Sequence, residues 1–319
     1  MTTDDFVRLR WRVTHPDPVI RAPALSPVVA DPTFLLPQET PDGRWHLIAH
    51  SIWGLHEHTS VDGIAWSAPR LIVRHGMRPF LVHDGGRYHL FYERYPAWRL
   101  PLSWLPGLRW RSWIERRSSA DLVTWSEPSV VLRPTFAWHR DPTYGEAAGN
   151  PCVVRDDRGW VLYYSASLVL VPDCGFTEPL HIGVARADDL EGPWRPEPDP
   201  ILSPSADDVR CNLGAGAIKV LRLDDGYAGL QNGIALDRDT GRSRSALFLR
   251  TSHDGVAWRW PHDEPLVAPE PAIAWRRRYV YACDCRRERA SGRWLLYFNG
   301  RDDASIVRGR EAIGFVVAS

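Results

Sequence analysis

Five apolar runs in this chain share one pattern, in which a tight polar turn is followed by an aromatic residue and then by a strand-like stretch. The five runs begin at Trp45, Tyr88, Trp160, Tyr227 and Trp294. Short apolar runs that are punctuated by Gly and Asp are typical of antiparallel strands and hairpins. We therefore expect each run to be one strand of a repeated supersecondary unit.

A second signature follows four of these runs: a turn that opens with Asp and closes on Trp. The tryptophans are Trp66, Trp125, Trp194 and Trp258. An aromatic face can stack on the apolar face of a sugar ring. However, a substrate would contact each repeat differently, whereas these residues recur at one position of the repeat. We predict that they pack between neighbouring repeats.

Repeats of this size, rich in strands and running from end to end, are typical of a β-propeller. We predict an all-β fold with a single domain over residues 1–319, a five-bladed β-propeller with four-stranded antiparallel blades. Short fourth strands are expected near residues 130–132, 201–202 and 266–267. The last blade lacks a fourth strand after Ser319, and we expect residues 7–11 to supply it and cover the open sheet edge.

One insertion interrupts the second blade between its second and third strands, at about residues 95–113. The insertion is rich in Trp, Leu, Pro and Arg. Three roles fit this composition: a surface loop folded on its own aromatics, a lid over the channel, or a contact between copies in a homo-oligomer.

The overall charge argues against a polyanionic partner. The chain has 39 Lys and Arg against 39 Asp and Glu, so neither a nucleic acid nor an anionic membrane surface is indicated. We find no apolar segment long enough to span a bilayer and no apolar signal core at the N-terminus.

Cysteine usage bears on the compartment and on metal binding. The five cysteines are an odd number, and the spacing of Cys283 and Cys285 is not that of a metal site. We expect free thiols, a cytoplasmic location, and no metal or other cofactor.

Propeller topology predicts which polar residues meet at the mouth of the central channel, because first strands begin there and second strands return there. A polar ring in an apolar β-fold indicates a polyhydroxylated or anionic small ligand. The candidate binding residues are His50, Arg78, Glu93, Asn150, Asn212, Gln231, Asn232, Arg244, Arg301 and Glu311.

The Asp31-Pro32 pair that opens the first blade, the Ser-x-Asp-Gly-x-x-Trp turn at residues 60–66 and the five repeats resemble glycoside hydrolase family 43 and its clan relatives. In architecture this resemblance covers nearly the whole chain. It implies a small carbohydrate or glycoside substrate and Asp31 as general base. Where the family has a second Asp this chain has Asn150, and residues 211–216 hold no carboxylate at the family's acid position, so the chain resembles a divergent member.

Glycoside cleavage needs a second carboxyl group, which donates a proton to the leaving oxygen. In inverting enzymes the two groups stand roughly 6.5–9.5 Å apart, and the acid must keep its proton near neutral pH. The nearest candidates are Glu146 and Asp208, followed by Glu93 and Glu311. Asp31 with Glu146 is the leading pair; in the alternative interpretation Glu146 is a loop carboxylate that caps a turn or pairs with Arg140.

The main functional prediction is therefore a glycoside hydrolase with a carboxylate acid/base pair at the channel mouth. Two alternatives stay open. A phosphate-dependent glycoside phosphorylase, similar to family 130, would need arginines that converge on one anion beside Asp31. The candidates for such a phosphate site are Arg78, Arg210, Arg244, Arg278 and Arg301. A non-hydrolytic sugar-binding or biosynthetic propeller would hold a single carboxylate at the mouth.

Overall fold

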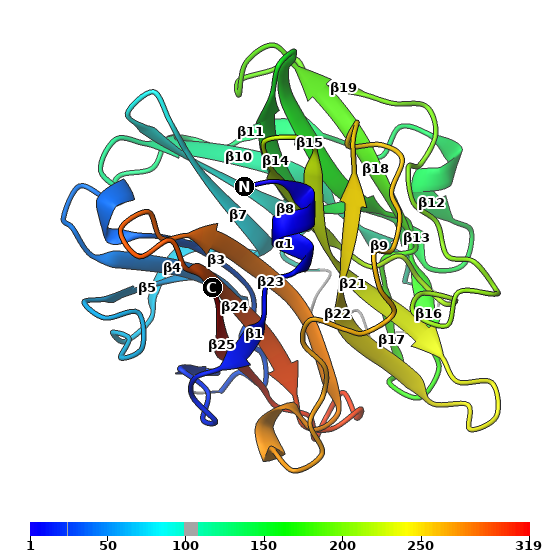
Figure 1. Cartoon of the computed structure of the whole chain (residues 1–319). Helices are drawn as coiled ribbons and strands as arrows, with labels where there is room; N and C mark the ends of the chain where they lie inside the picture. Colours follow the sequence, from blue (N-terminus) through cyan, green and yellow to red (C-terminus); the bar gives the residue numbers. More distant parts are fainter. Residues whose placement is uncertain (24, 99–107) are drawn as a thin grey trace.

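A computed structural model describes residues 1–23, 25–98 and 108–319 of the chain (Figure 1). In this part of the chain the fold is all-β. Helical structure is limited to α1 (Thr3–Val7) and to the short 3-10 helices η1 (Pro37–Glu39), η2 (Ala137–His139) and η3 (Ala274–Arg276).

Five antiparallel sheets follow one another along the chain. The first contains β3 (Ala30–Leu35), β4 (Trp45–Ser51), β5 (Gly54–Ser60) and β6 (Arg70–Arg74). The second contains β7 (Gly76–Asp84), β8 (Arg87–Arg94), β10 (Trp113–Ser119) and β11 (Ser129–Leu132). The third contains β14 (Ala148–Asp156), β15 (Gly159–Ala166), β18 (His181–Ala187) and β19 (Arg195–Pro196). The fourth contains β20 (Ile218–Arg222), β21 (Tyr227–Leu236) and β22 (Ser243–Ser252). The fifth contains β23 (Tyr279–Arg287), β24 (Trp294–Arg301), β25 (Glu311–Ala318), β1 (Trp11–Val13) and β2 (Ile20–Arg21).

Two small sheets stand outside this series. One is formed by β9 (Trp110–Arg111), β12 (Arg140–Asp141) and β13 (Gly145–Glu146). The other is a hairpin of β16 (Val169–Val171) and β17 (Phe176–Glu178), inserted between the second and third strands of the third sheet. Both contribute to the cavity described below.

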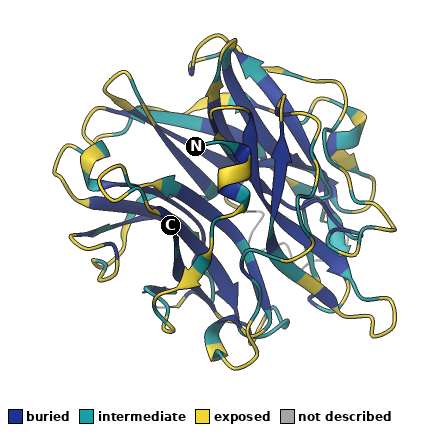
Figure 2. Ribbon diagram, viewed as in Figure 1, coloured by how far each residue is buried: buried dark blue, intermediate teal, exposed yellow. Residues whose placement is uncertain are grey.

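The first strands of the five sheets form a closed cycle of contacts: β3 with β7, β7 with β14, β14 with β20, β20 with β23, and β23 with β3. Figure 1 shows the sheets in chain order around the centre of the molecule. Buried apolar clusters lie between successive sheets; one joins Phe34 and Leu47 of the first sheet to Tyr297 and Phe315 of the fifth. Strand interiors are buried and the connecting loops are exposed (Figure 2).

The predicted packing of the repeated tryptophans between sheets is confirmed. Three of the four rings pack edge-on against an aromatic of the neighbouring sheet: Trp66 against Tyr297 at 5.7 Å between ring centroids, Trp194 against Phe91 at 6.0 Å and Trp258 against Tyr163 at 6.2 Å. Trp125 packs on the cluster shared by the first and second sheets. The Tyr297 hydroxyl also donates to the carbonyl of Gly63 in the Asp-to-Trp turn, at 2.5 Å. These turns therefore hold successive sheets together.

The N-terminal segment differs from its predicted form. Thr2 and Asp5 make a reciprocal capping box, which starts helix α1 at Thr3, so Val7 is helical and the strand begins only at Trp11. Strand β1 then pairs antiparallel with β25, with Trp11 opposite Ala318. The added strand lies at residues 11–13 instead of 7–11.

Two predicted fourth strands also differ. In the third sheet the fourth strand is β19, and residue 202 makes only an isolated bridge to Ile182. In the fourth sheet the described residues form three strands, and residue 267 makes only an isolated bridge to Leu247. Four prolines, at positions 261, 265, 269 and 271, explain why the predicted fourth strand does not form in the fourth sheet, because proline cannot donate to a strand ladder.

The predicted insertion at residues 95–113 is described only in part, and residues 99–107 lie outside the described residues. After them, Trp110 and Arg111 form strand β9, which pairs in parallel with β13.

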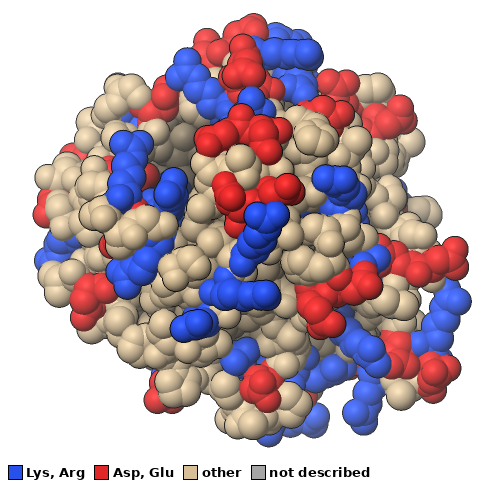
Figure 3. Space-filling model, in the orientation of Figure 1, with Lys and Arg blue, Asp and Glu red and all other residues tan. Residues whose placement is uncertain are grey.

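Three general features of the protein are its surface charge, the state of its cysteines and the length of its helices. Acidic and basic side chains are interspersed on the face shown in Figure 3, and all five cysteines are free and buried. In the described ranges, no helix is long and apolar enough to cross a membrane.

The contact between Trp194 and Phe91 can be tested by mutation. Trp194 is 9 % exposed and lies between the second and third sheets, so Trp194→Ala should lower the free energy of unfolding by roughly 3–5 kcal/mol. Trp53 is 47 % exposed, and Trp53→Ala is the matched control, with an expected change within about 0.5 kcal/mol. Urea titration measures both; similar losses in the two variants would contradict the inter-sheet role.

Candidate active site

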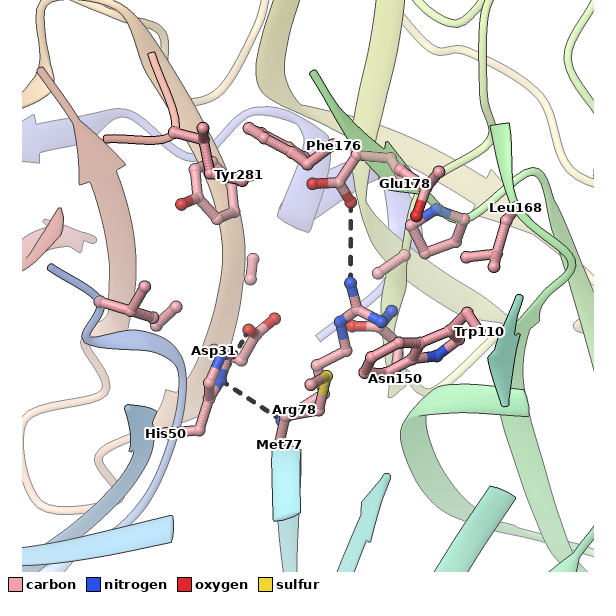
Figure 4. Close-up of a pocket in the computed structure, with 18 of the residues that line it drawn as sticks. Asp31, His50, Met77, Arg78, Trp110, Asn150, Leu168, Phe176, Glu178 and Tyr281 are labelled. Carbon is pink, nitrogen blue, oxygen red and sulfur yellow. Dashed lines mark hydrogen bonds and ion pairs between the residues drawn. The ribbon is translucent and has the colours of Figure 1, made fainter. Parts of the chain in front are cut away.

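A cavity of about 570 Å³ lies where the first strands of the five sheets begin (Figure 4). This volume is within the range of roughly 300–1,000 Å³ that is usual for small-molecule sites. Its lining comes from all five sheets, from the β16–β17 hairpin and from β9.

The floor of the cavity is built from one residue per sheet, each with left-handed backbone. These residues are Asp31 (φ 52°), Arg78 (φ 54°), Asn150 (φ 47°), Gly216 (φ 65°) and Ala282 (φ 34°), and all five line the cavity. Four of them lie at register shifts in the pairing of the first and second strands. β-bulges re-aim side chains, and strained non-glycine backbone is concentrated at functional sites.

Asp31, the predicted general base, lines this cavity while its side chain is 90 % buried. Its Oδ2 lies 3.1 Å from Nδ1 of His50, and its backbone N–H donates to Oδ1 of Asn299 at 3.2 Å. Burial acts to raise the pKa of Asp31, but the hydrogen bond to His50 and the positive charges of His50, Arg78 and Lys219 outweigh it and lower the pKa. Asp31 is therefore an ionised carboxylate at neutral pH.

Arg78 stands beside Asp31 and links two glutamates. Its Nη1 donates to Oε2 of Glu93 at 2.9 Å, and its Nη2 lies 3.8 Å from Oε2 of Glu178. Glu93 is fully buried behind the cavity wall. A Cβ atom on Gly149 would lie 1.7 Å from Oε2 of Glu93, so glycine is required there for this pair to form.

Glu178 lines the cavity but was not among the residues predicted from the sequence. It is the last residue of β17 and lines the cavity opposite Arg78 (Figure 4). Burial raises the pKa of Glu178 to about 7; the charge of Arg78 acts against this increase, and the charges of Asp31 and Glu311 add to it. Glu178 therefore holds its proton up to about neutral pH.

A third carboxyl group, Glu311, lines the cavity from the start of β25. It accepts hydrogen bonds from the Tyr281 hydroxyl and from Nη1 of Arg301, the latter at 2.8 Å. Burial raises the pKa of Glu311, although Arg301 offsets part of the effect. Tyr281 and Arg301 line the same part of the cavity.

Several predicted binding residues do meet here. The lining includes His50, Arg78, Asn150, Asn232, Arg301 and Glu311. Others do not reach the cavity: Gln231 is fully buried and bonds Ala215 and Arg250, and Asn212 bonds the backbone of Leu236. Arg244 pairs with Asp237 and borders only a minor adjoining pocket.

The two predicted candidates for the acid, Glu146 and Asp208, do not line the cavity. Glu146 lies between Arg111 and Arg140, with N–O distances of 2.9 and 3.1 Å, which matches its alternative interpretation as a paired loop carboxylate. Strand β13 pairs with β9 and β12, and this pairing holds Glu146 between the arginines of those two strands. Asp208 accepts hydrogen bonds from Arg210 and from the Trp260 indole.

The arginines considered as a phosphate site are each paired with carboxylates. Arg78 pairs with Glu93, Arg301 with Glu311, Arg210 with Asp208 and Asp263, Arg244 with Asp237, and Arg278 with Asp173. Two of the five, Arg78 and Arg301, line the cavity, and neither is free to neutralise an anion. Among the described residues, no cluster of three or more His, Cys, Asp or Glu side chains could hold a metal ion.

The hairpin that carries Glu178 is fastened at its turn to the fourth and fifth sheets. The Tyr279 hydroxyl lies 2.9 Å from Sγ of Cys174 and 2.7 Å from Oγ of Ser243. Asp173 accepts from the Ser243 backbone at 3.1 Å and from Nη2 of Arg278 at 2.6 Å. Since, among the described strands, β16 and β17 pair only with each other, these contacts fix where Glu178 stands.

Removing the Tyr279 hydroxyl tests this anchor. Tyr279→Phe keeps the ring but leaves Cys174 and Ser243 without that partner, at an expected cost of about 1 kcal/mol. Hydrogen exchange of the hairpin amides, residues 169–178, should become roughly five-fold faster. Tyr88→Phe is the control, because the Tyr88 hydroxyl donates to the carbonyl of Glu39. Unchanged hairpin exchange in Tyr279→Phe would contradict the anchor.

No protein-family model and no curated protein sequence matches the chain. Solved structures do match in fold. An N-acetylgalactosamine deacetylase from F. plautii, in complex with blood group B trisaccharide, is 16 % identical with a TM-score of 0.63, over 97 % of this chain and 95 % of that chain. A thermostable family-43 glycoside hydrolase is 11 % identical with a TM-score of 0.62, over 93 % and 91 %. Zg3597, a family 117 glycoside hydrolase produced by Zobellia galactanivorans, is 16 % identical with a TM-score of 0.56, over 97 % and 90 %.

These neighbours include propeller hydrolases, so the chain shares a β-propeller fold with them. The low identity limits the likeness to the fold. The shared fold agrees with the resemblance of this sequence to a divergent family-43 propeller.

Proposed function

We propose that this protein is a glycoside hydrolase in which Asp31 is the general base and Glu178 the general acid. In this proposal residues 1–319 form one domain, and the five sheets are the blades of a five-bladed propeller with the cavity at its mouth. The substrate is a small glycoside or glycoconjugate. Among the solved structures with a similar fold, glycoside hydrolases of families 43 and 117 support the reaction class.

The observation that carries the proposal is the pair of carboxyl groups with opposite protonation states in one cavity. The pKa of Asp31 is lowered and that of Glu178 is raised to about 7. Two carboxyl groups whose environments separate their pKa values are the usual signature of an acid and a base acting together. Glycoside cleavage requires this division of roles.

In the reaction, Asp31 accepts a proton from a water molecule, and the water oxygen attacks the anomeric carbon. The bond from that carbon to the glycosidic oxygen breaks, and Glu178 donates its proton to the departing oxygen. The products are a free sugar and an alcohol. Arg78 lies next to both carboxyl groups and stabilises the charge that Glu178 acquires as it loses its proton.

Hydrolysis fits the cavity better than the two alternatives. A phosphorylase would need free cationic groups beside Asp31, but Arg78 is paired with Glu93, and Arg301 is paired with Glu311. A non-hydrolytic sugar binder was expected to hold one carboxylate at the mouth, whereas Asp31, Glu178 and Glu311 all line the cavity. A cytoplasmic location and a homo-oligomeric contact through the 95–113 insertion stay predictions.

A panel of 4-nitrophenyl and alkyl glycosides, with and without phosphate, tests the proposed function. Asp31→Asn should abolish turnover of every substrate. Glu178→Gln should reduce kcat/KM for alkyl glycosides by about 10²–10⁴-fold and affect 4-nitrophenyl glycosides far less, because nitrophenolate leaves without a proton. In the wild type, kcat/KM should fall as the pH rises through about 7, since Glu178 loses its proton there.

Glu146→Gln is the matched control, because Glu146 lies between two arginines outside the cavity. Its kinetics should equal those of the wild type. Full activity of Glu178→Gln on alkyl glycosides, or phosphate-dependent release of a sugar phosphate, would overturn the assignment.

A further inference from the structure

Residues from both faces of the β16–β17 hairpin line the cavity, so the two faces are turned towards different parts of it. Residues directly opposite each other in the hairpin share a face, and neighbours along a strand alternate. Val171 pairs with Phe176 and Val169 with Glu178, so these four residues share one face. Leu170 pairs with Thr177, so both lie on the other face.

The face with Glu178 is turned towards the fourth and fifth sheets. Val171 and Phe176 pack with Ile234, Tyr279 and Tyr281 in one apolar cluster. On this side the cavity is lined by the polar side chains of Asn232, Tyr281, Arg301 and Glu311, together with Phe176 and Ile306. The floor positions here are Gly216 and Ala282, the two smallest of the five, so this polar compartment has room for a sugar ring above a hydrogen-bonding wall.

The opposite compartment is lined mainly by apolar side chains. Leu168 and Leu170 come from the hairpin segment, and Leu108 and Trp110 come from the segment that forms β9. The Trp110 ring is held by the buried Tyr95, with centroids 5.5 Å apart. In Figure 4, Trp110 and Leu168 lie on one side of Arg78. The side chains on the other side of Arg78 are those of Asp31, His50 and Tyr281.

Among the described residues, few polar side chains lie on this side: Asn150 is buried at the floor, and the others are more exposed. Arg109 and Thr143 are exposed, and Tyr144 and Thr177 are half-buried. A second sugar would need hydrogen-bond partners for its hydroxyl groups, because unpaired polar groups are costly to bury. Aliphatic and indole surfaces instead favour a ligand that gains free energy by leaving water.

We infer that the leaving group of the substrate is an apolar aglycone, aromatic or aliphatic, which binds between Leu108, Trp110, Leu168 and Leu170, while the sugar occupies the compartment with Tyr281 and Glu311. This inference rests on the proposed function and specifies its substrate class. Glu178 stands on the hairpin between the two compartments, where the glycosidic oxygen joins the sugar to the aglycone.

Calorimetric titration of the full-length protein with 2-naphthol, an aglycone without a sugar, tests the inference. The wild type should bind 2-naphthol with a negative heat-capacity change, the mark of apolar burial. Leu170→Asn should weaken binding roughly 10-fold, and Leu108→Asn is a second variant with the same expected effect. Leu170→Met keeps the apolar surface and should bind as the wild type does.

The matched control is Ile306→Asn. Ile306 lines the cavity in the segment between Arg301 and Glu311, on the polar side, so its replacement should leave 2-naphthol binding unchanged. Absence of 2-naphthol binding at millimolar concentration, equal binding in both Leu→Asn variants and the wild type, or an equal loss in Ile306→Asn would overturn the inference. Binding needs no turnover, so 2-naphthol binding without hydrolysis of any glycoside would support the apolar compartment while contradicting the proposed hydrolase.

Discussion

The pairing of Arg78 with the fully buried Glu93 is the interaction on which the site depends. An ion pair removed from water is tolerated only with close geometry, and here Gly149 leaves the space that the Glu93 carboxylate fills. Because Glu93 holds the guanidinium, Arg78 stays between Asp31 and Glu178 without neutralising either completely. The cavity can then hold one ionised and one protonated carboxyl group.

The same backbone feature, a residue with left-handed conformation at the cavity floor, is repeated around the molecule and places these groups. Left-handed residues at the floor positions give the cavity an Asp, an Arg and an Asn in succession, followed by two positions with little or no side chain. The repeated tryptophan turns keep successive sheets together, so the floor is rigid. Chemistry can then vary through additions such as the hairpin, whose turn is anchored at Tyr279 and whose last residue, Glu178, lines the cavity.

Repetition made the all-β fold and several of the residues that line the cavity predictable. Each turn recurred with its aromatic residue, and topology then brought Asp31, His50, Arg78 and Asn150 to one opening, where they line the cavity. Glu178 was missed because it lies in an insertion that breaks the repeat. The signal was present: Pro172, Asp173 and Gly175 form a turn between two β-rich runs, a pattern that predicts a hairpin. Glu146 does not line the cavity, because strand pairing with β9, which no repeat indicated, holds it between two arginines.

The protonation state of Glu178 is the most direct test of the account. Carboxyl-¹³C NMR of protein labelled at glutamate should show one side chain that titrates at about pH 7, well above the usual value of about 4.3. That resonance should be missing from Glu178→Gln and present in Glu146→Gln. If the resonance lost in Glu178→Gln instead titrates below about pH 5, in the range of an unperturbed glutamate, Glu178 is ionised at neutral pH and the acid/base pair proposed for this cavity does not exist.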